Sequence, residues 1–180
     1  MKKVLVLLAA LGMAFCLAQD VESLDPSGQT ITFWHQHSSE RLAGLKAIID
    51  DFNATNEWGI TVEHEYQGGY GDIFQKMLPI LGTSSAPNLV VAYQNQAATY
   101  AIGDGMVDMT PFVDSATWGL SAEDKADFFP GFYNADIFPS FGNARFGFPP
   151  NRSMEVLYFN AEWINEMYNA GAISFAGAPT

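Results

Sequence analysis

The stretch "TITFWHQHSSERLAGLKAIIDDFNATNEWGITVEHEY", residues 30 to 66, decides the fold class. It opens with a β-rich apolar run over 30–34, which favours a buried strand. Apolar residues then recur at helical spacing and predict an amphipathic helix over 39–53: Leu42, Leu45, Ile49 and Phe52. The run 60–66 alternates apolar and polar residues, which is typical of a second strand. A strand, a helix and a strand in this order predict a parallel pair.

The same alternation continues along the rest of the chain, apart from an irregular, aromatic-rich stretch over 106–141. We expect a helix from Asp72 to about Leu81 bent at Pro79, a strand over 88–93, a short helix over 95–102, a helix that starts at Ser121 with Asp124 in capping-box spacing, a strand over 154–160, and a helix from Ala161 that Gly171 ends. This order predicts an α/β fold with a mostly parallel sheet flanked by helices. Ligands of such sheets bind outside the carboxyl ends of the strands.

The N-terminus has the features of a secretory signal. Lys2 and Lys3 precede an apolar run that ends in small residues at Ala18, so we expect residues 1–18 to be a signal peptide. The protein is then secreted across the inner membrane, to the periplasm or the cell surface. A lipid anchor on Cys16 is the alternative, although Phe15 stands where a small residue would be expected.

Composition excludes several function classes. The chain has 20 acidic and 8 basic side chains and a net charge of −12, which disfavours nucleic acid and anionic membrane surfaces as partners. Its one cysteine lies in the leader, so no disulfide or redox chemistry is expected in the mature chain. The chain ends on "SFAGAPT" without a closing helix or strand, and we expect it to be the N-terminal part of a longer protein.

Enzyme motifs are sparse. The chain has no G-x-S-x-G elbow, no H-E-x-x-H and no P-loop lysine. His35 and His37 could belong to a secreted metal-dependent hydrolase, but a catalytic zinc site needs a third ligand. His64, the only other histidine, alternates with apolar residues and is interpreted as facing inward. We therefore expect no metal and no cofactor, and place His35 and His37 at the rim of a binding cleft. The hydrolase remains the alternative function.

Several segments together resemble a known family. "ITFWH", "LAGLKAIIDDFNATNEWGITVEHEYQGGY", "APNLVVAY" and "PPNRSMEVLYFN" occur in the order found in family 1 of the extracellular solute-binding proteins, which serve ABC importers. The likeness covers roughly residues 30–180. It is strongest to members that bind glycerol 3-phosphate or sugars, which also open on a "FWH" strand.

The resemblance implies a periplasmic-binding-protein fold of type II, with two α/β lobes around a cleft. Residues 19–150 would form the first lobe, and 151–180 the hinge crossover strand and the start of a truncated second lobe. The protein would not be an enzyme. It would bind a sugar, a polyol or a glycerol 3-phosphate-type ligand unchanged, deliver it to the transmembrane permease subunits of an ABC importer, and be a monomer when full length. A surface adhesion or sensor module on the same fold is a further alternative.

The expected ligand-binding residues are Tyr70, Tyr93, Gln94 and Ser153. Tyr70, Gln94 and Ser153 map by position onto ligand contacts of the glycerol-phosphate binders, although the family motif has a glutamate at Gln94. Independently, Tyr70, Tyr93 and Gln94 at strand ends supply the aromatic face, donors and acceptors that a polyol needs. The alternatives are that Tyr70 only covers a turn and that Ser153 only satisfies backbone groups at the hinge.

Overall fold

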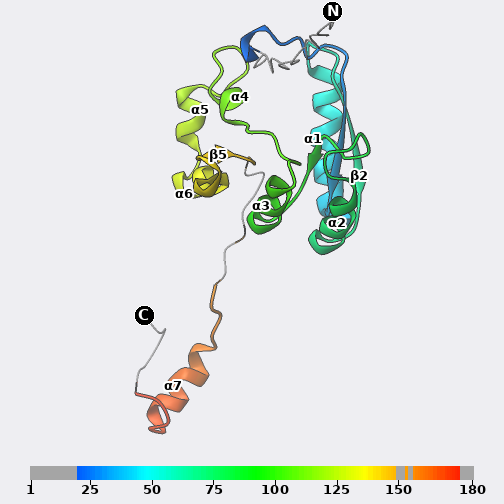
Figure 1. The fold of residues 1–180 in the computed structure, drawn as a ribbon. Helices are drawn as coiled ribbons and strands as arrows, with labels where there is room; N and C mark the ends of the chain where they lie inside the picture. Colours follow the sequence, from blue (N-terminus) through cyan, green and yellow to red (C-terminus); the bar gives the residue numbers. More distant parts are fainter. Residues whose placement is uncertain (1–19, 149–152, 154–155, 175–180) are drawn as a thin grey trace, which may run out of the picture. The chain divides into compact units, whose positions relative to one another are not determined.

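The protein is described by a computed structural model that covers residues 20–148, 153 and 156–174 (Figure 1). The chain divides into two compact units, Met1–Pro149 and Pro150–Thr180. The elements of the first unit are, in chain order, η1 (Val21–Ser23), β1 (Thr30–His35), α1 (Ser39–Thr55), β2 (Thr61–Tyr66), α2 (Tyr70–Met77), η2 (Leu78–Ile80), β3 (Leu89–Val90), α3 (Gln94–Ile102), α4 (Thr110–Val113), α5 (Ala122–Asp127), α6 (Pro130–Tyr133), η3 (Asn134–Asp136), β4 (Ile137–Phe138), η4 (Pro139–Phe141) and β5 (Ala144–Arg145). The second unit contains α7 (Ala161–Asn169). The expected signal peptide, with Cys16, lies outside the described residues.

Three parallel strands form the sheet, in the order β2-β1-β3. Phe33 on the central strand lies opposite His64 on one neighbour and Leu89 on the other. All three strands therefore end at the same edge, as the alternation of strands and helices predicts. The α/β fold with a parallel sheet is confirmed.

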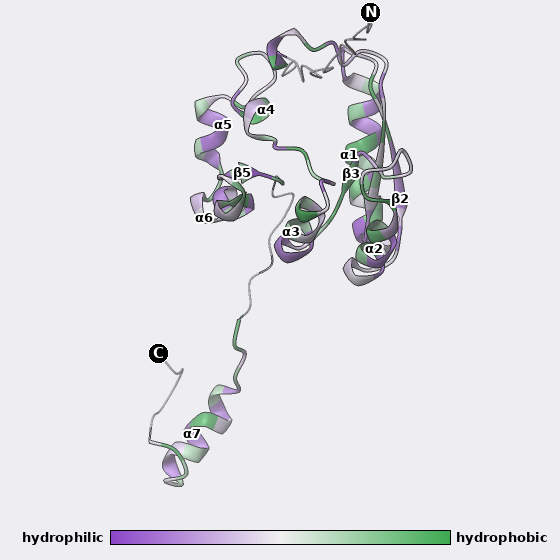
Figure 2. Cartoon of the chain, viewed as in Figure 1, coloured by the Kyte–Doolittle hydropathy of each residue, from purple (hydrophilic) through white to green (hydrophobic). Residues whose placement is uncertain are grey.

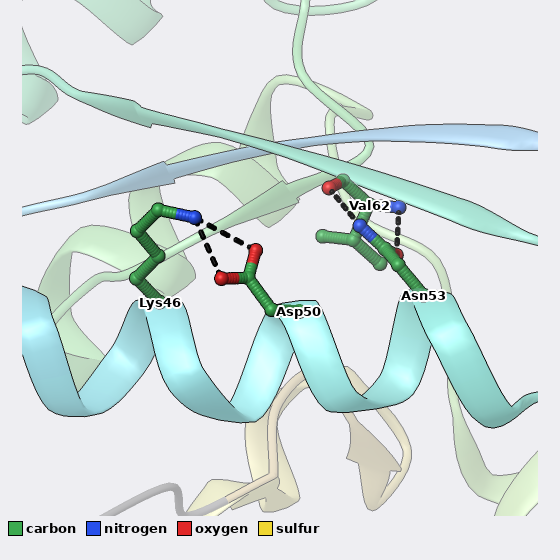
Figure 3. Close-up of polar contacts among 4 residues, drawn as sticks. All are labelled: Lys46, Asp50, Asn53 and Val62. Atoms are coloured by element: carbon green, nitrogen blue, oxygen red, sulfur yellow. Dashed lines mark hydrogen bonds and ion pairs between the residues drawn. The ribbon is translucent and has the colours of Figure 1, made fainter.

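Helix α1 runs beside the strands, and the Asn53 side chain forms hydrogen bonds to β2 (Figures 1 and 3). The Asn53 amide donates to the carbonyl oxygen of Val62 at 3.0 Å and accepts from its backbone N–H at 2.7 Å. Two turns earlier, Lys46 and Asp50 form an exposed ion pair on α1. Hydrophobic and hydrophilic residues alternate along the helix (Figure 2). The helix extends two residues beyond its predicted end.

The apolar core lies where α2 and α3 pack on the sheet. Ile73, Met77 and Tyr100 are buried together. Partly buried apolar side chains surround them, from β1, α2, η2, the β3 segment and the loop after α3: Trp34, Phe74, Ile80, Leu81, Val90, Val91, Ala92 and Met106. Helices α2 and α3, which begin at the carboxyl edge of the sheet, therefore share one apolar core.

Two predicted boundaries in this region are wrong. The helix expected from Asp72 begins at Tyr70, and a 3-10 turn replaces its last residues around Pro79. Asp72 still caps it, because its carboxylate accepts from the backbone N–H of Gly69 at 2.8 Å. The strand expected over 88–93 is only Leu89–Val90, because beyond it a single further bond, from the N–H of Val91 to the carbonyl of Trp34, follows the central strand.

The stretch expected to be irregular contains short elements. Helices α4, α5 and α6 are followed by an antiparallel hairpin of β4 and β5. The capping box at the start of α5 is confirmed: Ser121 Oγ accepts from the backbone N–H of Asp124, whose carboxylate accepts from that of Ser121. Such short elements depend on tertiary contacts rather than on hydrophobic periodicity.

The second unit contains one helix with a clear start and end. The Asn160 side chain accepts from the backbone N–H groups of Glu162 and Trp163, and Gly171 adopts a left-handed φ of 69° after the helix. The strand expected over 154–160 is absent over 156–160, the part that the structure describes. Several large apolar side chains are exposed there: Val156, Leu157, Tyr158, Trp163 and Met167. No helix in the described ranges combines the length and apolarity that a membrane crossing requires.

Candidate functional site

The carboxyl edge of the sheet brings several sequence-predicted residues together. Strand β1 ends at His35 and is followed by Gln36 and His37. Helices α2 and α3 both begin at this edge, the first with Tyr70 and the second just after Tyr93. The edge is the position at which open parallel sheets bind their ligands.

Tyr70 and Tyr93 form a stacked pair. Their ring centroids are 4.2 Å apart and the ring planes are inclined by 25°. Tyr70 is half-buried, whereas 54% of Tyr93 is exposed. The pair therefore presents one open aromatic face, of the kind on which the apolar face of a sugar ring can lie.

Two glutamines hold this tyrosine pair in place. The Gln96 side chain is buried; it accepts from the backbone N–H of Tyr93 at 2.9 Å and donates to the carbonyl oxygen of Tyr70 at 3.2 Å. Gln36 donates from Nε2 to the Tyr70 hydroxyl at 2.9 Å. Gln96 thus joins the first turns of α2 and α3, and Gln36 ties the pair to the end of β1.

Two polar atoms at the edge are buried without a hydrogen-bond partner in the described part of the chain. They are Gln36 Oε1 and His37 Nδ1, on adjacent residues. An unpaired buried polar atom costs about 1–3 kcal/mol, and native proteins keep few of them. Gln36 Nε2 contacts the Tyr70 hydroxyl, so the unpaired oxygen of the same amide lies close to the tyrosine pair.

The remaining predicted site residues lie in different places. Gln94 is the first residue of α3, next to Tyr93, and its half-buried side chain makes no hydrogen bond to the described residues. Ser153 is exposed and belongs to the second compact unit. The structure therefore brings Tyr70, Tyr93 and Gln94 together at one edge.

His35 is not at a cleft rim, and that expectation is wrong. Its side chain is fully buried, because the rings of Phe33, His64 and Tyr66 lie around it. His35 Nδ1 accepts from the backbone N–H of His37 at 3.2 Å, so the ring proton is on Nε2. That Nε2 donates to His64 Nδ1 at 3.1 Å. His64 faces inward as predicted, with a partner.

The buried ring of His35 favours its neutral form. Burial lowers the pKa of His35 below its ordinary value of 6.5, and His64 and His37 lower it further. Both ring nitrogens of His35 take part in hydrogen bonds, so neither has a lone pair free for a metal. Among the described residues, no three His, Cys, Asp or Glu side chains are grouped to hold a metal ion. The geometry thus supports a structural role for His35 over a hydrolase site.

Two site residues did not emerge from the sequence. Gln36 lies between the two histidines that drew attention, and no pattern singles it out. Gln96 does have a sequence signal. It stands three residues after Tyr93, the residue that precedes α3, and this is the position of the Glu or Gln acceptor in a capping box. The box pattern starts from Ser or Thr, and here Tyr93 occupies that place.

Comparison with known proteins agrees with this fold. A family model described as "Bacterial extracellular solute-binding protein" matches residues 47–173, most of the chain. A search of the curated proteins finds no match. The family implies a solute-binding role outside the cytoplasm, in the periplasm or at the cell surface.

Proposed function

Because the chain belongs to the bacterial extracellular solute-binding proteins, we propose that the edge formed by Tyr70, Tyr93 and Gln94 binds a sugar or a related polyol without converting it. The observation that carries this proposal is the exposed ring of Tyr93 in the stacked pair, with the half-buried amide of Gln94 next to it in the chain. Tyr93 supplies the stacking surface, and the Gln94 amide supplies a donor and an acceptor for ligand hydroxyls.

The chemistry of this edge favours a neutral ligand over glycerol 3-phosphate. The groups that surround the pair are amides, hydroxyls and a histidine cluster whose buried member has a lowered pKa. Gln94 carries an amide, where the family that the sequence resembles has a carboxylate. An amide can both donate and accept hydrogen bonds.

The proposed architecture is that of a two-lobe receptor. Residues 19–150 would form one wall of the cleft, and residues from 151 onward, including Ser153, would lead into the second. Residues 1–18 would direct secretion, and the ligand-loaded protein would deliver its cargo to the permease subunits of an ABC importer. Family membership supports a receptor role.

Ligand binding to variants of the full chain tests this site. A panel of sugars, polyols and glycerol 3-phosphate would be screened by thermal shift, because a ligand that binds only the folded state raises its stability. Calorimetry would then compare the variants. We expect Tyr93→Ala and Gln94→Ala each to weaken binding about five- to 150-fold, the equivalent of about 1–3 kcal/mol.

Matched controls come from exposed residues of the first unit that make none of the contacts described for this edge. Gln75 on α2 and Phe129 before α6 are exposed, so Gln75→Ala and Phe129→Ala should leave affinity unchanged. Full affinity in both Tyr93→Ala and Gln94→Ala would show that the ligand binds elsewhere. A ligand that must carry a phosphate would contradict the neutral-ligand proposal while leaving the position of the site intact.

A further inference from the structure

A pocket separate from the sheet-edge site lies in the first unit, built entirely from residues between Thr110 and Arg145. Its volume is about 280 Å³, and none of its lining residues belongs to the sheet-edge site. Its polar lining comes from α4 to β5: Asp114, Lys125, Tyr133, Asn134, Asn143 and Arg145. The pocket therefore combines two cations, one carboxylate and two amides.

Arg145 is held rigidly in the wall of this pocket. Only 4% of it is exposed. Its backbone N–H donates to the Asp108 carboxylate at 3.0 Å, and its carbonyl accepts from the N–H of Met109 at 2.7 Å. Its Nη1 donates to the carbonyl oxygen of Tyr133 at 2.7 Å, and its guanidinium carbon lies 4.3 Å from the centre of the Tyr133 ring.

No carboxylate of the described residues forms an ion pair with Arg145. The ion pairs among the described residues are Lys46 with Asp50 and Lys125 with Asp114, so no carboxylate there lies within ion-pair distance of the guanidinium. The stacked tyrosine offsets only part of the cost of burying a cation. A guanidinium has five N–H donors, and the described protein accepts from one of its two Nη atoms.

Among the residues that line the pocket the balance of charge is positive, in a chain whose net charge is −12. Lys125 Nζ lies 2.8 Å from Asp114 Oδ1, so these two charges cancel and the charge of Arg145 remains. Asn134 and Asn143 add amide donors. Planar guanidinium groups match carboxylates through paired hydrogen bonds.

We propose that this pocket binds the carboxylate group of a small organic acid, with Arg145 as its main partner and Lys125 as a second cation. One positive charge in excess suits a monoanion. The volume leaves room for a short organic group beside the carboxylate. The site is independent of the sheet-edge site and concerns a second ligand or a stabilising anion.

Acetate titration of the full chain tests this proposal, with chloride at equal ionic strength as the reference. We expect saturable binding of acetate by calorimetry and a matching rise in thermal stability. Arg145→Gln should weaken acetate binding more than about tenfold, because it removes charge-assisted hydrogen bonds. Lys125→Met should weaken it about two- to fivefold, as an ion pair at a partly exposed site does.

Asp114→Asn gives the most distinctive expected result, because it should raise the affinity for acetate rather than lower it. It removes the competing carboxylate and frees Lys125, so acetate should bind more tightly. Lys46→Met and Asp50→Asn change net charge by the same amounts on α1, where the pair is exposed, and should leave acetate affinity unchanged. If Arg145→Gln does not fold, the Lys125 and Asp114 variants still decide the question. No saturable acetate binding, equal shifts in the α1 controls, or weaker binding in Asp114→Asn would each overturn the proposal.

Discussion

Within the first unit, the sheet region and the pocket segment, residues 110–145, bury different kinds of residue. Under the sheet edge the buried side chains are largely apolar, with Ile73 and Tyr100 fully enclosed. Around the pocket the buried side chains are mostly polar or charged: Ser115, Asp136 and Arg145, with Val113 as the apolar exception. Each region therefore offers a different chemistry to a ligand.

The two proposed sites would therefore suit two kinds of ligand. An apolar core supports a rigid edge whose exposed groups are neutral, and neutral hydrogen-bonding groups suit polyols. The pocket segment instead keeps a buried cation in place through an aromatic ring and a backbone carbonyl. Charge at that place would select an anion, although the protein as a whole repels anions.

The largest expected effect is on the apolar core. Ile73→Ala should lower the free energy of unfolding by about 2–5 kcal/mol, because truncation leaves a cavity beneath α2. Chemical denaturation of the full chain measures it. Ile102→Ala, at an exposed position, should change stability by less than about 0.5 kcal/mol. A smaller loss for Ile73→Ala than for Val113→Ala would remove the distinction between the two regions.

The next largest effect is expected for Gln96, whose side chain joins the first turns of α2 and α3 at the sheet-edge site. Gln96→Ala leaves the Tyr93 N–H and the Tyr70 carbonyl without this partner and should cost about 1–3 kcal/mol of stability. Binding of the sheet-edge ligand should weaken as well, whereas acetate binding in the pocket should not change. Asn95→Ala, an exposed neighbour on α3, is the matched control. Equal effects of the two variants would show that Gln96 does not position the tyrosines.

The free energy of unfolding should depend on pH through His35 of the histidine cluster, whereas no histidine lines the pocket. Because the pKa of His35 is lowered on folding, the unfolded chain binds the proton more readily, and stability should fall as pH drops below about 6.5. One proton contributes a slope of at most about 1.4 kcal/mol per pH unit. The loss continues down to the lowered pKa of the folded state.

The measurement is the free energy of unfolding between pH 7 and pH 5. His35→Gln should flatten the slope. Carboxylates such as Glu22, whose pKa is lowered to about 2 by hydrogen bonds from Thr117, Ser115 and Ala116, lose their stabilising effect only at lower pH. An unchanged slope in His35→Gln would assign the pH dependence to other groups.

The smallest effects should come from the two ion pairs. The Lys46 side chain is 57% exposed, and its pair with Asp50 should contribute about 0.3–0.5 kcal/mol. The Lys125 side chain is 28% exposed, so its pair with Asp114 should contribute more, up to about 1 kcal/mol. Double-mutant cycles on each pair measure these couplings. Equal values would mean that the pocket does not strengthen its ion pair.

Local patterns predicted the helices better than the short strands. The spacing of apolar residues predicted α1, and a capping signal predicted the start of α5, because both depend on residues a few positions apart. The strand expected over 88–93 was overestimated, because a continuous apolar run indicates burial but not the length of the pairing. The hairpin of β4 and β5 had no such pattern, since each strand has two residues.

For the candidate site, topology indicated the edge that we propose binds a ligand, but not the contacts between its side chains. The rule that ligands bind after parallel strands singled out Tyr70, Tyr93 and Gln94, and the structure brings these three together. It misplaced His35, because a residue at a strand end can point into the core or away from it. Gln36 was missed because its importance depends on the Tyr70 hydroxyl, 34 positions away in the chain.

Periodicity and chain connectivity predicted the order of the main strands and helices and the parallel sheet, and they indicated the edge that we propose binds a ligand. Tertiary contacts were needed to show that His35 turns inward toward His64, that Tyr70 stacks on Tyr93, and that the buried Arg145 guanidinium forms no ion pair with a carboxylate of the described residues. Each depends on side chains from separate segments meeting in space. Whether a polar residue becomes a ligand contact, a structural hydrogen bond or a buried charge is decided by those neighbours.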